Sequence, residues 1–345
     1  MKIKKLFQTL FTSILIATIF LFQGCSFMGN QPPKWQSGMF TPDGKYYVYT
    51  YGQVFVTQYK KRGGSTFSSG FLTSYLQVID INYGKEMLEK PLKSKEMIEI
   101  ETIEENQVAL WSYKIGENEY SPAVFDLDNL TMKFSAEDLK ELNPNVPLKN
   151  VNIYFTNTSS NPGIIFEGDD GRKKRINPQT GIITDISGDF ERVDIKSSDC
   201  YQTEPIAENY GMSSGTRQKI TKGSGRNSSA TSTDDFLNPE FLVLDEKTDA
   251  KKEVTKFDDN FFILSQTLTT NKKLMQLTML DQKSLQTKWN LRLPQNDQEM
   301  NAYNKERFLL KGNKMFLANA TYILVIDLDK GLITEKYPLY KQDKT

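Results

Sequence analysis

A strand–turn–strand unit recurs along this chain, and it constrains the fold more than any other feature of the sequence. In each copy a short apolar stretch runs into Asp or Asn, and Gly or another small or polar residue follows a few positions later. The Asp or Asn side chain hydrogen-bonds its own backbone to start a turn, and the later residue accepts the positive φ angle that finishes it. The first Asp or Asn of the six copies is Asp80, Asp126, Asn177, Asp245, Asp281 and Asp327.

The six turns are separated by 46, 51, 68, 36 and 46 residues. The mean, about 49 residues, is in the range of a four-stranded propeller blade. Alternating segments rich in β-branched and aromatic residues precede the turns, as at residues 45–59, 107–114 and 314–320. The sequence therefore predicts an all-β chain, a β-propeller of about six blades with degenerate repeats. The unequal spacing leaves a pair of β-sandwiches as the alternative.

The units resemble the PQQ-like, quinoprotein-type β-propeller repeat. In that repeat an apolar strand runs into an Asp-containing turn with Gly, and the next strand ends in an aromatic or apolar residue before Pro. This ending occurs at residues 87–92, 289–294 and 334–339, and the resemblance covers roughly residues 38–340. The quinone-dependent dehydrogenases that share the repeat bind calcium and cofactor through groups with no counterpart that we can place on this chain. The resemblance therefore implies an architecture and no cofactor, metal or catalytic residue.

Two other segments depart from the strand pattern. Ser135 followed by Asp138 opens a capping-box-like start, and Asn143 with Pro144 ends the short helix that this predicts, which we expect at a blade edge. Residues 212–235 are rich in Ser, Thr and Gly and predict a flexible insertion that accounts for the 68-residue interval. A similar Gly/Ser loop is expected over residues 62–70. The cations of the insertion are a candidate contact for lipid headgroups or an acidic partner, the alternative being a solvated loop: Arg217, Lys219, Lys222 and Arg226.

The first 24 residues are typical of a signal peptide, with three lysines before an apolar stretch over residues 6–22. The stretch ends at Gly24 and Cys25 and resembles the lipobox of bacterial lipoproteins, whose cysteine is lipidated and becomes the mature N-terminus. This predicts lipidation of Cys25, a lipidated tether over residues 25–37 and a propeller-like domain over 38–345. A plain transmembrane anchor is the alternative, but the stretch is short and is interrupted by polar residues such as Gln8, Thr9, Thr12 and Ser13. Ser26 stands where an inner-membrane retention signal has Asp, so we expect the outer membrane, facing the periplasm.

Composition removes most catalytic classes. The chain has no histidine, which excludes Ser/His/Asp and Cys/His constellations and the commonest zinc ligand. Its 43 basic residues balance 43 acidic ones, so no basic field indicates nucleic acid. With Cys25 acylated, Cys200 has no intramolecular partner, and we interpret it as a buried thiol. The carboxylates of 167–171 are interpreted as a hairpin turn rather than a calcium loop.

These observations predict a cell-envelope lipoprotein that acts as a non-catalytic protein-binding scaffold, held to the membrane by its lipid and bound to an envelope protein. In plan it is similar to the propeller lipoprotein of the outer-membrane β-barrel assembly machine. The alternative is an envelope enzyme, or a small-molecule (saccharide) binder that uses the propeller channel. Trp111 and Trp289 are expected to pack between blades rather than to bind a ligand.

Overall fold

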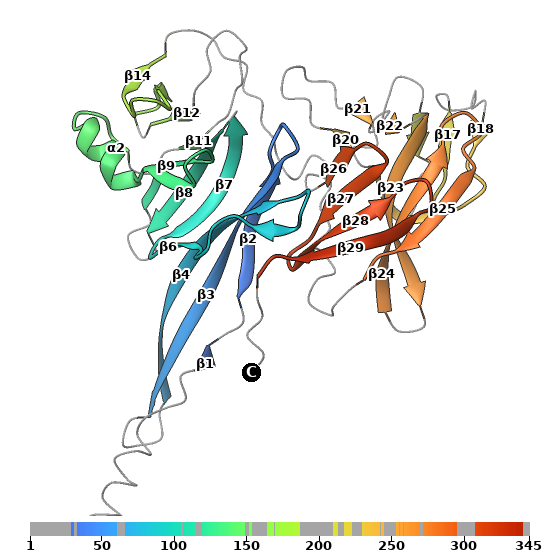
Figure 1. The fold of residues 1–345 in the computed structure, drawn as a ribbon, viewed down its shortest axis with the longest axis horizontal. Coiled ribbons are helices and arrows are strands. Elements are labelled where there is room, and N and C mark those ends of the chain that lie inside the picture. Colours follow the sequence, from blue (N-terminus) through green and yellow to red (C-terminus); the bar gives the residue numbers. More distant parts are fainter. Residues whose placement is uncertain are drawn as a thin grey trace, which may run out of the picture.

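In its described residues the computed structural model is built from antiparallel sheets and one short helix (Figure 1). It describes residues 29–30, 33–60, 66–104, 106–114, 119–148, 152–153, 164–168, 170–186, 210–212, 217–222, 230–241, 243–244, 253–254, 256–257, 259–269, 272–294 and 308–340. Cys25, Cys200, Asp245 and Arg226 lie outside these residues.

The first sheet is organised around two 15-residue strands that pair along their whole length. Its strands are β1 (Gly29–Asn30), β2 (Lys34–Phe40), β3 (Tyr46–Lys60), β4 (Thr66–Asp80), β5 (Lys85–Glu86) and β6 (Leu92–Ser94). β4 begins at Thr66, so the expected loop over residues 62–70 was wrong for residues 66–70. The backbone of Ser68, Ser69 and Gly70 pairs with β3, and local Gly/Ser composition cannot reveal a partner strand.

The second and third sheets are four-stranded antiparallel meanders. The second contains β7 (Met97–Glu104), β8 (Gln107–Lys114), β9 (Glu119–Asp126) and β10 (Thr131–Phe134). The third contains β11 (Asn152–Ile153), β12 (Ile164–Glu167), β13 (Lys173–Ile176) and β14 (Ile183–Asp185). β12 and β13 form an antiparallel hairpin with Glu167 opposite Lys173 and with Gly171 at φ 71° in its turn, which confirms the predicted hairpin.

The predicted helix is α2 (Ala136–Leu142), and its capping box is confirmed. The backbone N–H of Asp138 donates to the Ser135 hydroxyl at 3.1 Å, and the Asp138 carboxylate accepts from the Ser135 backbone N–H at 2.7 Å. Asn143 ends the helix and donates its amide to the carbonyl oxygens of Leu139 and Gly181. The helix is thereby attached to the turn between β13 and β14.

The remaining strands form a penultimate sheet, a last sheet and two small sheets. The penultimate sheet contains β16 (Arg217–Gln218), β19 (Phe236–Phe241), β22 (Lys256–Phe257), β23 (Asn260–Thr269), β24 (Lys272–Asp281) and β25 (Thr287–Arg292). The last sheet is a meander of β26 (Phe308–Lys311), β27 (Lys314–Ala318), β28 (Tyr322–Asp327) and β29 (Leu332–Pro338). The small sheets are β15 (Tyr210–Met212) with β17 (Ile220–Lys222) and β18 (Ala230–Thr231), and β20 (Val243–Leu244) with β21 (Glu253–Val254).

The segment 212–235, expected as a flexible insertion, contributes β16, β17 and β18 in its described part. Ile220 is fully buried, and its backbone N–H donates to the Ser232 hydroxyl at 2.9 Å. The Ser232 backbone N–H donates back to the carbonyl oxygen of Ile220 at 2.8 Å. The described residues of this segment therefore form paired strands and not one unpaired loop. The buried side chain of Ile220 and its two hydrogen bonds with Ser232 hold them in place.

The middle sheets bury both of their faces. In β3, Tyr47 and Tyr49 pack against the last sheet, while Val48 packs against the second sheet. Residues that alternate along a strand lie on opposite faces, so these contacts place one neighbour on each side of the first sheet. The last sheet alternates in the same way, with Val325 facing the first sheet and Ile326 facing the penultimate one. A pair of two-layer sandwiches would leave one face of each sheet exposed.

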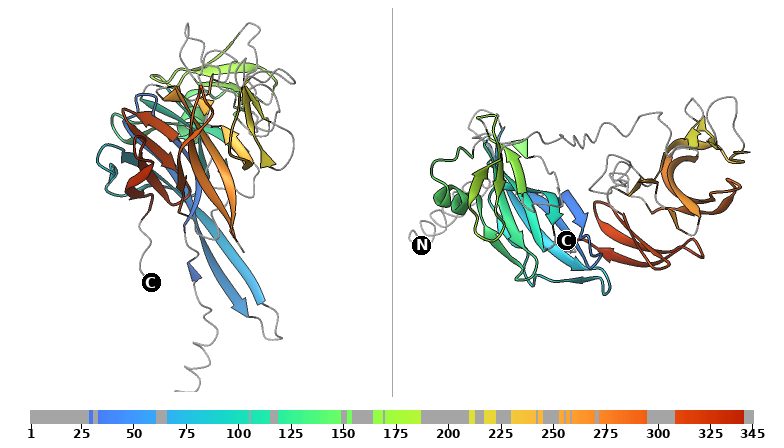
Figure 2. Two further views of the ribbon diagram at one scale, coloured as in Figure 1. Left: turned by 90° about the vertical axis from the view of Figure 1, so that its right-hand side faces the viewer. Right: turned by 90° about the horizontal axis from the view of Figure 1, so that it is seen from above.

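The sheets follow one another in an arc: third, second, first, last, penultimate (Figure 2, right). The first and last sheets of the chain are neighbours in the middle of this arc, as terminal blades are in a propeller. The described residues form no closed ring. What the structure establishes is a mostly-β chain of several antiparallel sheets packed face to face.

Candidate functional site

The predicted repeat turns occupy one equivalent position in the fold. In five sheets the Asp or Asn ends the third strand of a meander or stands directly after it, and the turn leads into the outermost strand. The side-chain oxygen of each accepts a hydrogen bond from the backbone N–H two residues on. The acceptor–donor pairs are Asp80 with Asn82 at 2.9 Å, Asp126 with Asp128 at 2.9 Å, Asn177 with Gln179 at 2.9 Å, Asp281 with Lys283 at 3.0 Å and Asp327 with Asp329 at 3.0 Å.

These Asp and Asn side chains stabilise their own turns by accepting hydrogen bonds from the backbone. The backbone N–H of Ser284 holds the pKa of Asp281 below its usual value, and that of Lys330 does the same for Asp327.

Four residues after each Asp or Asn, the backbone takes the left-handed conformation. The residues in that position are Gly84, Leu130, Gly181, Leu285 and Gly331, with φ between 55° and 70°.

At three of these positions the neighbouring sheet sends a side chain against the left-handed glycine. A Cβ at Gly84 would lie 2.3 Å from the Tyr337 ring, and one at Gly331 would lie 2.6 Å from the Trp289 ring. A Cβ at Gly181 would lie 2.9 Å from Leu142 and 3.0 Å from Phe134. Trp289 therefore packs between sheets, as the sequence predicts, and Trp111 packs edge-to-face on Tyr120 with 5.5 Å between ring centroids.

The hairpin of β3 and β4 reaches beyond the body of the first sheet (Figure 1). Flanking strand β2 ends its pairing at Lys34 opposite Gly52, and β6 ends its pairing at Ser94 opposite Ser74. Past these points the ladder continues to Lys60 opposite Thr66, and the one described strand that flanks it there is β1, whose Gly29 and Asn30 pair with Val56 and Phe55. We call residues 53–60 and 66–73 the outer hairpin.

One face of the hairpin carries a series of aromatic side chains from Tyr47 to Phe55. At the end of the hairpin that carries Asp80, Tyr47 and Tyr49 are fully buried under the last sheet, with 6.1 Å between their ring centroids. Tyr51 comes next, stacked on Tyr75 at 5.0 Å and tilted against Tyr340 at 5.6 Å. Burial raises the pKa of Tyr51 to about 12, with smaller contributions from Tyr75 and Glu86.

The outer hairpin continues this face without the covering sheet. Phe55 and Phe71 stand opposite each other in the ladder, in the same alternation as Tyr51 and Tyr75, and their rings stack at 5.0 Å. Phe71 is 61% exposed. The sequence pattern of alternating aromatics identified a strand here, but it did not reveal that the aromatic face extends past its cover.

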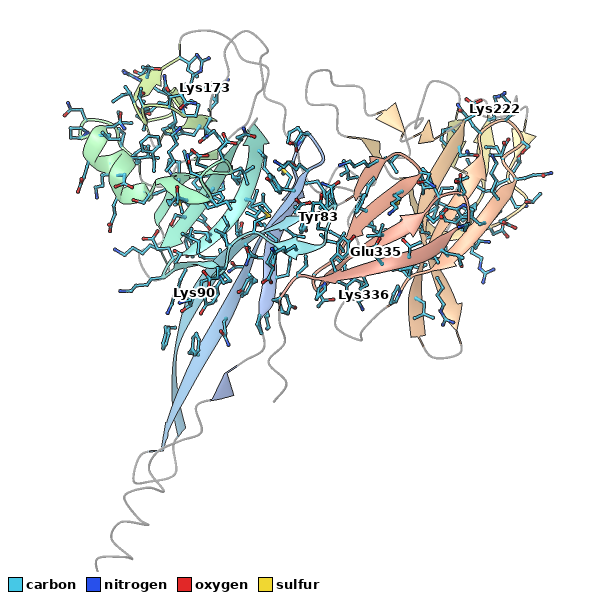
Figure 3. The ribbon with its side chains drawn as sticks, in the orientation of Figure 1. Tyr83, Lys90, Lys173, Lys222, Glu335 and Lys336 are labelled. Carbon is cyan, nitrogen blue, oxygen red and sulfur yellow. The ribbon has the colours of Figure 1, made fainter. Side chains whose placement is uncertain are left out.

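Exposed apolar side chains also gather at the opposite end of the sheets, where the repeat turns lie. We call this end the turn rim. Tyr83 is 80% exposed, three residues after Asp80, and Leu332 is 56% exposed, five residues after Asp327. Across the junction of the first and last sheets, Lys311 Nζ donates to the Asn82 side-chain oxygen at 2.8 Å. Figure 3 places Tyr83 beside the last sheet, which carries Glu335 and Lys336.

Among the described residues, one carboxyl group has a strongly raised pKa, and it lies on β7. Burial raises the pKa of Glu101 to about 7, and the charge of Glu99 adds to the effect. Burial also raises the pKa of Glu99. This strand is held to β2 by the backbone N–H of Ile100, which donates to the Ser37 hydroxyl at 2.7 Å. No pattern in the sequence indicated these two carboxyl groups, because their burial depends on how the sheets pack.

Within the described residues, no group of three or more His, Cys, Asp and Glu side chains is arranged to hold a metal ion. The described helix is too short and too polar to cross a membrane. Cys25, whose lipidation the sequence predicts, lies outside the described residues, four residues before β1.

Comparison with known proteins yields structures and no family. No protein-family model matches the chain, and no curated protein matches it. Among solved structures, apo AztD from Citrobacter koseri aligns over 87% of this chain and 84% of its own, at 9% identity and a TM-score of 0.24. The β-propeller domain of the trilobed protease from Pyrococcus furiosus, described as having an open velcro topology, aligns over 92% and 98%, at 8% identity and a TM-score of 0.26. Because both TM-scores are low, the architecture rests on the sheet topology and packing above.

Proposed function

We propose that this chain is a lipid-anchored protein of the bacterial cell envelope that acts as a non-catalytic protein-binding scaffold. In this proposal its sheets are the blades of a PQQ-like propeller of about six blades. Cys25 carries the lipid, and the protein faces the periplasm from the outer membrane. The proposal requires one end of the molecule at the membrane and another end free to bind a partner. The length of the β3–β4 hairpin separates these two ends.

The observation that carries the proposal is the exposed aromatic side chain of Tyr83 on the turn rim. β3 runs 15 residues from the turn rim to the far end of the hairpin, or about 50 Å at the usual rise of a strand. The segment that leads from Cys25 joins the hairpin at β1, in its outer part. The turn rim therefore lies at the end away from the anchor, where an envelope protein has access. Aromatic residues are enriched among the anchors of protein interfaces.

Photo-crosslinking tests this proposal in intact envelopes. A photoreactive phenylalanine analogue in place of Tyr83 is expected to capture one defined protein band. The matched control carries the same analogue in place of Tyr120, which is 42% exposed and packs on Trp111 and Tyr113 away from the turn rim. Equal, diffuse labelling from both positions would reject a specific partner at the turn rim.

The second candidate function is an envelope enzyme or a small-molecule binder, and Glu101 is the observation that favours it. A carboxyl group with a pKa near 7 is protonated often enough to serve as an acid or as a hydrogen-bond donor. Saccharide binding measured by calorimetry would support this candidate if it were lost in Glu101→Gln and kept in Glu89→Gln, an exposed control.

A further inference from the structure

The hairpin of β3 and β4 has one aromatic face, which is covered near the body of the first sheet and uncovered in the outer hairpin. The covered part ends at Tyr51 and Tyr75, which contact Tyr340 next to the last sheet. Four positions further out, Phe55 and Phe71 stack on each other, and Phe71 remains 61% exposed. A two-stranded ribbon is marginally stable in water, so an aromatic pair on it with one exposed ring, that of Phe71, indicates a surface that something else covers.

The chain itself indicates what covers it. β1 pairs Gly29 with Val56 and Asn30 with Phe55, so the N-terminal segment meets the hairpin at the stacked Phe55–Phe71 pair. Cys25 precedes Gly29 by four residues, which span at most about 14 Å when fully extended. A lipid on Cys25 would therefore enter a bilayer within about 14 Å of the residue opposite Val56.

The sequence at the end of the hairpin fits a membrane surface as well. β3 ends at Lys60, and the next two residues in sequence are Lys61 and Arg62. The ladder pairs Tyr59 with Phe67 just before this point. Cations clustered next to aromatic residues in the sequence are the composition that binds anionic lipid surfaces, since aromatic rings favour the interface and cations favour acidic headgroups.

We propose that the outer hairpin lies against the surface of an anionic phospholipid bilayer, with Phe55 and Phe71 in the interfacial layer. This inference rests on the lipid anchoring in the proposed function and specifies its geometry. An anchor this close keeps the hairpin at high local concentration beside the lipid, so a weak intrinsic affinity is sufficient. The molecule then stands on the membrane, with its turn rim directed away from the bilayer.

The test uses full-length chain purified from envelopes and reconstituted into vesicles of phosphatidylcholine and phosphatidylglycerol whose acyl chains are brominated. Bromine quenches only tryptophans that lie close to the lipid. Phe71→Trp adds such a reporter at the exposed pair, and Tyr83→Trp adds one on the turn rim as the matched control. We expect Phe71→Trp to lose more emission on bromination than the wild type, and Tyr83→Trp to lose no more than the wild type.

Charge is tested in the same vesicles with Lys60→Gln, Lys61→Gln and Arg62→Gln combined in the Phe71→Trp chain. The triple change is expected to reduce the excess quenching, and so is replacement of phosphatidylglycerol by phosphatidylcholine. Excess quenching that is equal in neutral and anionic vesicles would overturn the anionic specificity.

Flotation with the vesicles distinguishes failure of this inference from failure of the anchor. A chain that does not float has no membrane anchor, which overturns the proposed function. A chain that floats without excess quenching at position 71 keeps its anchor and overturns the hairpin contact, leaving a protein as the cover of Phe71. Circular dichroism of each variant shows whether its sheets are retained.

Discussion

The indole Nε1 of Trp289 donates a hydrogen bond to the backbone carbonyl oxygen of Leu328 at 2.8 Å. Trp289 lies on β25 of the penultimate sheet, and Leu328 follows β28 of the last sheet, so this bond joins neighbouring sheets. The same indole closes the space at Gly331, where a Cβ would lie 2.6 Å from the ring. One aromatic side chain thus sets both the hydrogen bonding and the spacing of a repeat turn.

We predict that Gly331→Ala lowers the free energy of unfolding more than Gly312→Ala. Both glycines have a left-handed φ, 62° and 59°, so an added Cβ costs each variant about 1 kcal/mol. No heavy atom lies within 4 Å of a Cβ at Gly312, whereas at Gly331 the Trp289 ring must move. Overpacking of this kind costs a further 1–3 kcal/mol, roughly. Urea unfolding measures both variants, and equal losses would contradict the close approach of the indole.

The two leucines in left-handed turn positions allow strain and burial to be compared. Leu285 is fully buried with φ 55°, and Leu130 is half-buried with φ 56°. Glycine relieves about 1 kcal/mol of backbone strain at either position, but removal of a buried leucine side chain costs about 2–5 kcal/mol. Leu285→Gly is therefore expected to destabilise the protein, and Leu130→Gly to change its stability little. Chemical denaturation gives both values, and a stabilised Leu285→Gly variant would mean that strain outweighs burial there.

The turns were predictable because their chemistry is local. Asp80, Asp126, Asn177, Asp281 and Asp327 bond backbone groups two residues away, so the pattern is visible in a few letters of sequence. The capping box at Ser135 and Asp138 is local in the same sense. The left-handed backbone at Leu130 and Leu285 was less visible, because leucine rarely accepts positive φ and only packing holds it there.

The features that sequence reasoning missed depend on contacts across the fold. Residues 66–70 look like a polar loop, yet they pair with the far half of β3. The exposure of Phe71 follows from where β2 and β6 end, and the raised pKa of Glu101 follows from the packing around β7. None of these three features depends on neighbouring residues in the sequence, so periodicity and composition could not predict them.

The buried ammonium of Lys174 allows two substitutions to be compared, one that removes its carboxylate partners and one that removes the ammonium itself. Its side chain is 4% exposed, and its Nζ lies 2.8 Å from Asp170 Oδ2 and 3.0 Å from Asp185 Oδ1. Asp170→Asn combined with Asp185→Asn leaves a buried cation without a charge partner, which is expected to cost about 3 kcal/mol. Lys174→Met removes the charge and keeps the volume, so it is expected to cost less than about 1.5 kcal/mol. Thermal unfolding compares the two, and a reversed order would show that the ion pair itself stabilises the third sheet.

Glu101 predicts how stability depends on pH. Its pKa is about 7 in the folded chain, against an ordinary value of 4.5, because burial and then Glu99 disfavour the carboxylate. Since the folded pKa is raised, the stability linked to this group is fully present below about pH 4.5 and is lost as pH rises through 7. The loss for the wild type is on the order of 2 kcal/mol after allowance for partial exposure.

Glu101→Gln removes this dependence, because an amide has no charge to bury. The variant is expected to match the wild type near pH 4.5 and to exceed its free energy of unfolding by about 2 kcal/mol at pH 8. Glu89→Gln, at an exposed position, should keep the slope of the wild type between these pH values. Urea unfolding at intervals from pH 4.5 to 8 measures all three chains. Parallel curves for Glu101→Gln and the wild type would show that Glu101 is hydrated in the folded protein, and they would remove the observation that favours an acid or hydrogen-bond donor on β7.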